Sequence, residues 1–152
     1  MAVRAVLDVN VLVSAILGLG LGRTSPPVRA LVAGLEGEYV LVASPRRLDE
    51  LHAVLRRPRF GLAADLAVRW ADLVAGSAHL VRTRGRLRVL TRDPSDNEVL
   101  ECALRGRAGF LVTGNVRHFK ELGPAERSVI LYRGVRVVTP REFVGSALGD
   151  ER

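Results

Sequence analysis

The amino-acid sequence predicts an α/β fold in which helices cover both faces of a central, mainly parallel sheet of about five strands, a three-layer α/β/α sandwich. Short apolar segments that resemble buried strands alternate along the chain with amphipathic segments that resemble helices. Such alternation is typical of βαβ units, which build parallel sheets. The length of 152 residues suits one domain. We expect residues 1–147 to form it and residues 148–152 to be a short C-terminal tail.

The predicted strands are short and apolar. Residues 3–7, 39–43 and 109–113 are apolar on both alternating faces, Arg4 excepted, as expected for central strands that helices cover on each side. Weaker strand patterns occupy residues 78–81 and 134–138.

Helical patterns fill the intervals between these strands. Ser44-Pro45 and Asp93-Pro94 each place a capping side chain before a proline at the first helical position. The expected helices cover residues 11–17, 27–35, 45–56, 63–75 and 94–105, and a short closing turn covers residues 140–144.

The composition is that of a globular chain, with 48% hydrophobic and 26% charged residues. No apolar stretch approaches the length of a membrane span, and the N-terminus has no signal-peptide pattern. We therefore expect a cytoplasmic protein that does not contact the membrane. The lone cysteine, Cys102, excludes an internal disulfide and is interpreted as a small core residue of its helix.

The chain is strongly basic, with a formal net charge of +7, and Lys120 is its only lysine. Guanidinium groups match phosphate geometry, so this composition favours a polyanionic partner. Solvated arginines that reflect codon usage in the source organism are an equally open explanation. The arginines form two clusters, Arg46, Arg47, Arg56, Arg57 and Arg59, and then Arg82, Arg84, Arg86, Arg88 and Arg92.

Polar residues follow the three strongest strand candidates. Asp8 follows the first, Ser44 the second, and Thr113 with Asn115 the third. Open parallel sheets bind ligands outside the carboxyl ends of their strands, so these side chains predict a binding site with Asp8 at its centre. Helix capping is the alternative role for Asp8, although Asn10 lies nearer the predicted helix and could cap it unaided.

Asp96 lies near the centre of the apolar stripe of its predicted helix, which includes Val99 and Ala103. A carboxylate that faces a core is unfavourable unless it is paired or coordinated, so Asp96 indicates a nearby cation. A capping box with Asp93 as N-cap and Asp96 at N3 is an alternative that the spacing leaves open.

The remaining acidic residues are less informative. Spacing does not choose between Asp49 and Glu50, and an exposed ion pair with Arg46 is the default for Glu50. Glu98 and Glu101 fall opposite the apolar stripe and are expected in solvent. The histidines have no zinc-site spacing, and His118 is interpreted as a surface residue. Carboxylate oxygens suit Mg²⁺ or Mn²⁺ instead.

At four segments the chain resembles PIN-domain nucleases. These segments occur in order and span almost the whole chain: LDVNVLVSAI, SPRRLDELHAVL, DPSDNEVLECALRGRAGFLVTGNVRHF and VVTPREF. The chain is most similar to the VapC-like group, the PIN-family toxins of bacterial and archaeal toxin–antitoxin modules. The resemblance implies a three-layer α/β/α protein that hydrolyses RNA with Mg²⁺ or Mn²⁺ held by clustered acidic residues.

The resemblance also assigns the site. It places the catalytic acids at Asp8, Glu50 and Asp96, which would hold the metal, and it selects Glu50 over Asp49. The fourth catalytic position, often Asp in the family, is Asn115 here, whose amide offers an oxygen without charge.

Further residues would then contact the substrate. Asn10 and Thr113 match polar positions beside the acids, and Arg46, Arg47 and Arg117 near the rim would hold the RNA backbone through its phosphates. The partners implied are an RNA substrate, a cognate antitoxin protein and a second copy of the chain in a homodimer.

Two alternatives follow from the same residues. The charge missing at Asn115 favours a catalytically weakened PIN-like module that binds RNA or protein. A haloacid-dehalogenase-like phosphatase also places Asp after an apolar strand, but Asn10 stands where its general acid belongs, and Lys120 is the only lysine.

Overall fold

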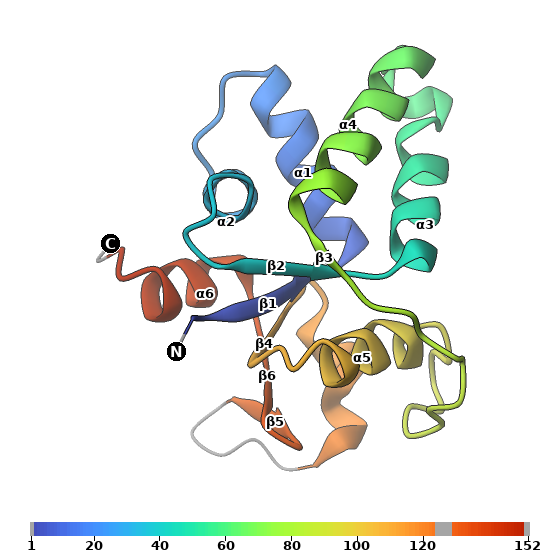
Figure 1. Ribbon diagram of the computed structural model, residues 1–152, viewed down its shortest axis with the longest axis vertical. Helices are drawn as coiled ribbons and strands as arrows, with labels where there is room; N and C mark the ends of the chain where they lie inside the picture. The colour runs from blue at the N-terminus through green and yellow to red at the C-terminus, as the bar shows by residue number, and fades with distance from the viewer. Residues whose placement is uncertain (1, 124–128, 151–152) are drawn as a thin grey trace.

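A six-stranded sheet forms the centre of the computed structural model, which describes residues 2–123 and 129–150 (Figure 1). The strand order is β3-β2-β1-β4-β6-β5, and all neighbouring pairs are parallel except β5 with β6. The strands are β1 (Arg4–Leu7), β2 (Val40–Ala43), β3 (His79–Leu80), β4 (Phe110–Val112), β5 (Ile130–Tyr132) and β6 (Val135–Val138).

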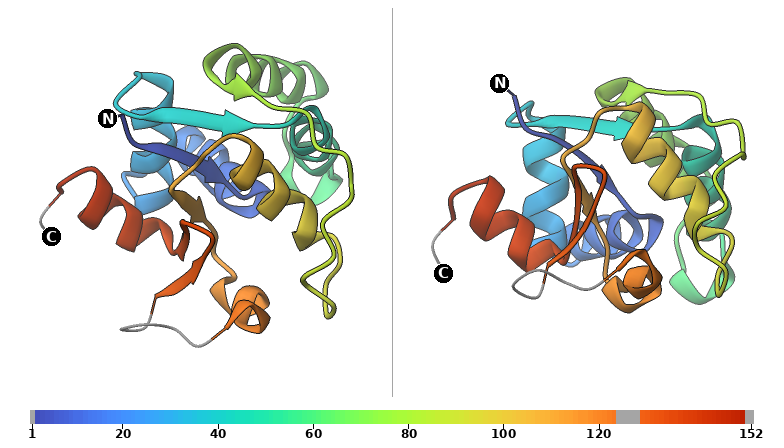
Figure 2. Two further views of the ribbon diagram at one scale, coloured as in Figure 1. Left: turned by 60° about the horizontal axis from the view of Figure 1, so that its bottom comes forward. Right: turned by 90° about the horizontal axis from the view of Figure 1, so that it is seen from below.

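Helices cover both faces of this sheet, which confirms the predicted three-layer α/β/α sandwich (Figure 2). Helices α1 to α4 and α6 pack on one face, and α5 with the 3₁₀ helix η2 packs on the other. The helices are α1 (Val9–Gly20), α2 (Pro26–Leu35), α3 (Pro45–Leu55), η1 (Pro58–Phe60), α4 (Ala64–Ser77), α5 (Asp96–Arg105), η2 (Val116–Leu122) and α6 (Pro140–Ala147).

Side chains of the central strands alternate between two cores. In β1, Ala5 and Leu7 belong to the core beneath α1 and α2, whereas Val6 belongs to the core beneath α5. All three side chains are at most 2% exposed. Burial on both faces is why these strands are apolar without alternation. Cys102 is fully buried in the second core, as expected.

One strand, β5, was not predicted from the sequence. β5 pairs with β6 in the antiparallel direction at the edge of the sheet, and its three residues include the half-exposed Leu131. Three residues are too few for a period-2 pattern to stand out, so the predicted count of about five strands is one short.

Helix starts depend on the capping residue. Ser44 caps α3 as predicted, because its Oγ accepts a hydrogen bond from the Arg47 N–H at 3.2 Å. The Asp93-Pro94 pair does not start α5, which begins at Asp96. Asp93 instead accepts hydrogen bonds from the Ser95 N–H and hydroxyl, so the capping box considered for Asp93 and Asp96 is absent.

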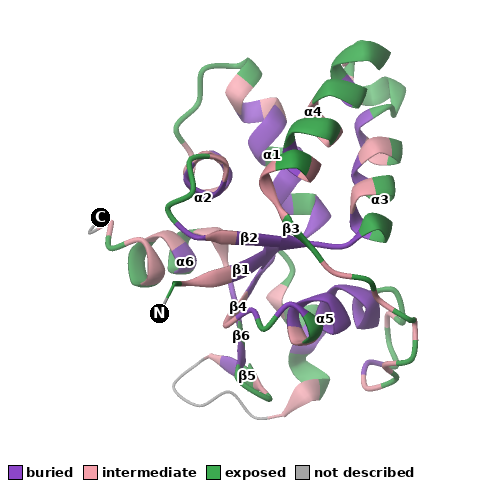
Figure 3. Ribbon diagram, in the orientation of Figure 1, coloured by how far each residue is buried: buried purple, intermediate pink, exposed green. Residues whose placement is uncertain are grey.

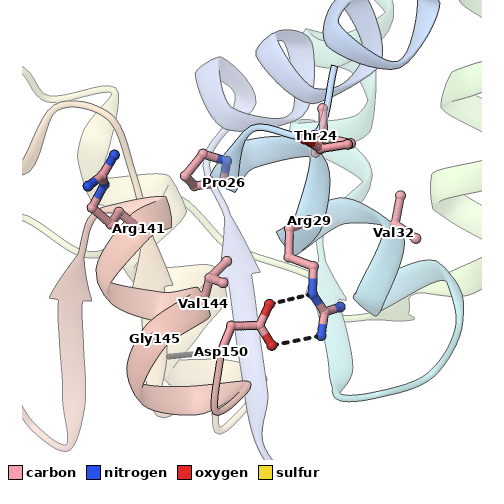
Figure 4. Close-up of a pocket in the computed structure, with 9 residues that line it drawn as sticks. Thr24, Pro26, Arg29, Val32, Arg141, Val144, Gly145 and Asp150 are labelled. Atoms are coloured by element: carbon pink, nitrogen blue, oxygen red, sulfur yellow. Dashed lines mark hydrogen bonds and ion pairs between the residues drawn. The ribbon is translucent and has the colours of Figure 1, made fainter. Parts of the chain in front are cut away.

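The end of the chain packs against α2. Asp150 forms a bidentate pair with Arg29, with an Nε–Oδ2 distance of 2.7 Å (Figure 4). Arg29 also pairs with Glu38. Between α2 and α6 this arrangement encloses a cavity of about 610 Å³, lined by apolar side chains such as Val32 and Val144. No helix in residues 2–123 and 129–150 is long and apolar enough to cross a membrane.

Close packing of α5 on β2 requires a glycine at residue 106. A Cβ atom at this position would overlap Cγ1 of Val42, a core side chain that is 1% exposed. We expect Gly106→Ala to lower the free energy of unfolding by about 1–3 kcal/mol, the usual effect of overpacking. Urea unfolding checks this. Gly76 is the control, since it lies in α4 with open space around it, and Gly76→Ala should stabilise by about 0.5–1 kcal/mol. Equal effects of the two substitutions would contradict the packing argument.

Candidate metal and catalytic site

The carboxyl ends of three neighbouring strands bring the predicted site residues to one edge of the sheet. Asp8 follows β1, which lies between β2 and β4, and Ser44 and Thr113 follow these two neighbours. From β1 the chain continues to β2 and β3 on one side and later returns to β4 on the other. Such a switch point is where open α/β sheets bind ligands.

Asp8 both caps a helix and joins a cluster of polar side chains. Its Oδ1 accepts a hydrogen bond from the Val9 N–H at 2.8 Å, and its Oδ2 accepts one from the Thr113 hydroxyl at 2.9 Å. The residue is only 8% exposed. Asn10 is not the cap, because it lies within α1, and its Oδ1 accepts from the Gly114 N–H at 3.2 Å. These bonds tie the end of β1 to the turn after β4.

Asp96 opens α5 with its carboxylate 13% exposed, and the prediction that it points inward is confirmed. Burial, with the nearby carboxylates of Asp93 and Asp8, raises the pKa of Asp96 to about 6. His118 opposes this shift, since its Nδ1 lies 3.2 Å from Asp96 Oδ2. The site thus concentrates negative charge that a cation would stabilise.

Three side chains could share one metal ion. Ligand atoms of Asp93, Asp96 and His118 all lie within 4.8 Å of one another. Carboxylate oxygens suit Mg²⁺ and Mn²⁺, so this donor set fits the divalent ion expected from the sequence. From the sequence, Asp93 is expected to be a cap, and His118 a surface residue or an aid to substrate contact. His118 is in fact half exposed, but no sequence signal places it beside Asp96, because 22 residues separate the two.

Arg47 occupies a position that the sequence analysis did not foresee. It was predicted to hold the RNA backbone, but it is only 6% exposed and faces three carboxylates. Its guanidinium lies 2.7 Å from Glu50 Oε2, 2.6 Å from Glu98 Oε2 and 3.8 Å from Asp8 Oδ1. Glu50 therefore pairs with Arg47 and not with Arg46. Arg47 is an internal counter-ion at this edge of the sheet.

Glu98 and Glu101 are buried, which contradicts their predicted exposure. Glu98 is 5% exposed and accepts hydrogen bonds from the hydroxyls of Ser44 and Thr83, both at 2.7 Å. Glu101 is 6% exposed and accepts from backbone N–H groups, which hold its pKa below the usual range against the effect of burial. Residues 81–95 cover this side of α5, so the helix is buried on both sides (Figure 3).

The other predicted residues lie at the rim. Asn115, Arg46 and Arg117 are exposed, and the Asn115 N–H donates to the Thr113 hydroxyl at 3.0 Å. Glu50 is also exposed, with 46% of its side chain accessible. Within the part of the chain that the structure describes, the acidic and histidine side chains close enough to share an ion are Asp93, Asp96 and His118, and the predicted ligands Asp8 and Glu50 lie outside this group.

The fold and its switch-point carboxylates define a nuclease-type α/β domain. Residues 4–117, three quarters of the chain, match the family model described as PIN domain, and the chain belongs to this family. PIN domains are generally nucleases, which are hydrolases, and they typically use divalent metals. Comparison with curated proteins and with solved structures gave no match.

Arg47 and Glu98 form a buried ion pair, and its loss should lower the free energy of unfolding. We expect Arg47→Met to lower the free energy of unfolding by about 3–5 kcal/mol, because it leaves a buried carboxylate without a counter-ion. Glu98→Gln removes that charge and keeps an oxygen for Ser44 and Thr83. The double variant should therefore be more stable than Arg47→Met alone. Urea unfolding in EDTA measures this, and strictly additive losses would contradict a direct coupling.

Proposed function

We propose that the protein is a Mg²⁺- or Mn²⁺-dependent endoribonuclease. The observation that carries this proposal is the cluster of Asp93, Asp96 and His118 at the switch point of a PIN-domain sheet, with Asp8 near enough to raise the pKa of Asp96. Few structural roles require three carboxylates to share one corner, since their mutual repulsion is unfavourable without a cation.

The acids would divide the work. Asp8, Asp93 and Asp96 would hold the ion, and Glu50, which is exposed to solvent, would hold it through a water. The bound ion supplies polarisation of the scissile phosphate and a lower pKa for the attacking water. Thr113 keeps the Asp8 carboxylate oriented through its 2.9 Å hydrogen bond. Asn10 and Asn115, which are both exposed, would contact the substrate strand.

A polyanionic substrate agrees with the charge of the protein. The net charge is +7, and Arg46 and Arg117, which are near Glu50 and Asn115 in the sequence, are exposed. Arginine contacts to phosphates position a nucleic acid without reading its bases. RNA as the substrate rests on the resemblance to VapC-like toxins.

The same resemblance supports the biological setting. The protein would be the toxin of a type II toxin–antitoxin module, acting in the cytoplasm, with a cognate antitoxin protein and a second copy of the chain as partners. Exposed apolar side chains on α4, among them Leu66, Val68 and Leu73, would suit such contacts.

Asn115 favours a second candidate, a PIN-like module that binds RNA or protein with a weakened catalytic site. An amide at the fourth position removes one negative charge from the ligand set, so metal would be held less tightly than by a fourth carboxylate. This module would bind RNA without cleaving it.

Cleavage of labelled RNA tests the proposed activity directly. We expect wild-type protein to cleave in Mg²⁺ or Mn²⁺ and not in EDTA. Asp8→Asn and Asp96→Asn should each lower the rate by about 100-fold or more, because the ion contributes several kcal/mol to catalysis. Asparagine caps helices as well as aspartate does, so Asp8→Asn leaves α1 capped.

Two neighbouring acids on α3 provide the matched control. Glu50→Gln should impair cleavage, whereas Asp49→Asn, an exposed neighbour, should not. Wild-type protein that binds RNA but never cleaves it would favour the binding module. Cleavage that persists in EDTA would exclude a metal-dependent mechanism.

The charge at residue 115 should control metal affinity. We expect Asn115→Asp to tighten Mn²⁺ binding several-fold in calorimetric titration, because ligand charge raises affinity for hard cations. Ala64→Asp adds the same charge at the exposed start of α4 and should leave the affinity unchanged. Equal affinities in all three proteins would mean that residue 115 does not reach the ion.

A further inference from the structure

The segment of residues 81–90 alternates like a strand, but only its first residue bonds to the sheet, through the Val81 N–H and the Ala43 carbonyl of β2, and among the described residues 82–90 pair with no strand. Its odd-numbered apolar residues, Val81, Leu87 and Val89, pack on the core beneath α5. The even-numbered residues from 82 to 88 are all arginines, and all are exposed. The segment therefore presents a row of guanidinium groups on the outer side of α5.

Buried polar side chains of α5 hold this segment in place. Glu101 accepts hydrogen bonds from the N–H groups of Arg84 and Arg86. Asn97 Oδ1 accepts from the N–H groups of residues 89 and 90, at 3.1 and 2.8 Å. These contacts involve only the backbone of the segment. Arg88 donates to the Gly85 and Leu87 carbonyls, whereas the side chains of Arg82, Arg84 and Arg86 are left for other partners on an anchored backbone.

Three of the exposed arginines surround one cavity of about 310 Å³. It is lined by Pro45, Arg46, Arg82, Thr83, Arg84 and Gly85, so no acidic residue lines it. Among the described residues, none of these three guanidinium groups takes part in an ion pair. Gathering like charges without a counter-ion is unfavourable, and an anion in the cavity would relieve the repulsion. We name this cavity the arginine cleft.

A short series of contacts connects the arginine cleft to the candidate catalytic site. The Thr83 hydroxyl, in the wall of the cleft, donates to Glu98 Oε1 at 2.7 Å. The other oxygen of Glu98 lies 2.6 Å from Arg47, whose guanidinium lies 3.8 Å from Asp8. A single strand could therefore contact the cleft and the carboxylates at the same time.

We propose that the arginine cleft binds backbone phosphates of the RNA strand, beside the phosphate that is cleaved at Asp8 and Asp96. Identifying the strand as RNA rests on the proposed function. The cleft itself recognises phosphate through the forks of Arg46, Arg82 and Arg84, which suit its oxygens. Contacts of this kind fix the register of the strand and carry no base specificity.

Anisotropy of a labelled single-stranded RNA in EDTA, where metal-dependent cleavage cannot occur, tests this proposal. We expect Arg82→Gln/Arg84→Gln to weaken binding about tenfold and to reduce the slope of log K against log salt by about 0.7–1.4, for one or two lost phosphate contacts. The control, Arg69→Gln/Arg141→Gln, removes the same charge from exposed positions on α4 and α6. It should change affinity less than twofold. Urea unfolding should be the same for both double variants.

The outcomes separate the cleft from the nuclease activity. Equal weakening by the two double variants would indicate net charge alone and would overturn the cleft, and so would unchanged binding in both. Selective weakening in EDTA by a protein that never cleaves RNA would support the cleft and contradict the proposed activity. Metal-dependent cleavage with unaltered binding by Arg82→Gln/Arg84→Gln would support the activity and overturn the cleft.

Discussion

The crowding of carboxylates at one edge of the sheet is the constraint on which this structure depends. Asp8 lies there because it follows β1, Asp93 and Asp96 lie there because α5 begins at this edge, and Glu50 and Glu98 approach from α3 and α5. Arg47 is the only fixed cation that contacts three of these acids within the described chain. It neutralises the side of the cluster toward α3, whereas Asp96 retains only the neighbouring His118. Arg47 therefore balances the negative charge of Asp8, Glu50 and Glu98, whereas the charge around Asp96 would be balanced by a bound cation.

This division of charge involves both sides of α5. One side carries Asp96 at the catalytic corner, and the other carries Glu98 and Glu101, which organise the arginine-rich segment. Burial of these glutamates is tolerable because hydroxyls and the Arg47 guanidinium meet Glu98, and backbone N–H groups with Arg105 meet Glu101. The same helix thus carries Asp96 of the candidate site and anchors the arginine-rich segment. The proposed metal and phosphate sites would lie on adjoining surfaces because a single helix connects them.

The sequence was sufficient for the fold and for the edge of the sheet that bears the site. Apolar strands buried on both faces are recognisable locally, and the rule for parallel strands then places Asp8, Ser44 and Thr113 together. The sequence did not predict the burial of side chains that are covered by a segment distant along the chain. Glu98 and Glu101 lie opposite the apolar stripe of α5, and only the packing of residues 81–95 over that side buries them. Arg46 and Arg47 are adjacent in α3, but the rotation of the helix by one residue turns Arg46 to solvent and Arg47 to the buried carboxylates. Asp93 and His118 meet Asp96 through tertiary structure alone.

The contrast between Arg46 and Arg47 also bears on the meaning of the net charge. An arginine-rich composition is compatible with codon usage alone, and that explanation predicts guanidinium groups scattered over the surface. Here Arg47 is committed to internal carboxylates, Arg29 to Glu38 and Asp150, and Arg105 to Glu101. Arg46 lies instead with two arginines of a separate segment around a cavity that no acid lines. A backbone anchored by buried carboxylates maintains this arrangement against its own repulsion. Such a concentration of uncompensated charge at a fixed place favours selection for an anionic ligand over compositional drift.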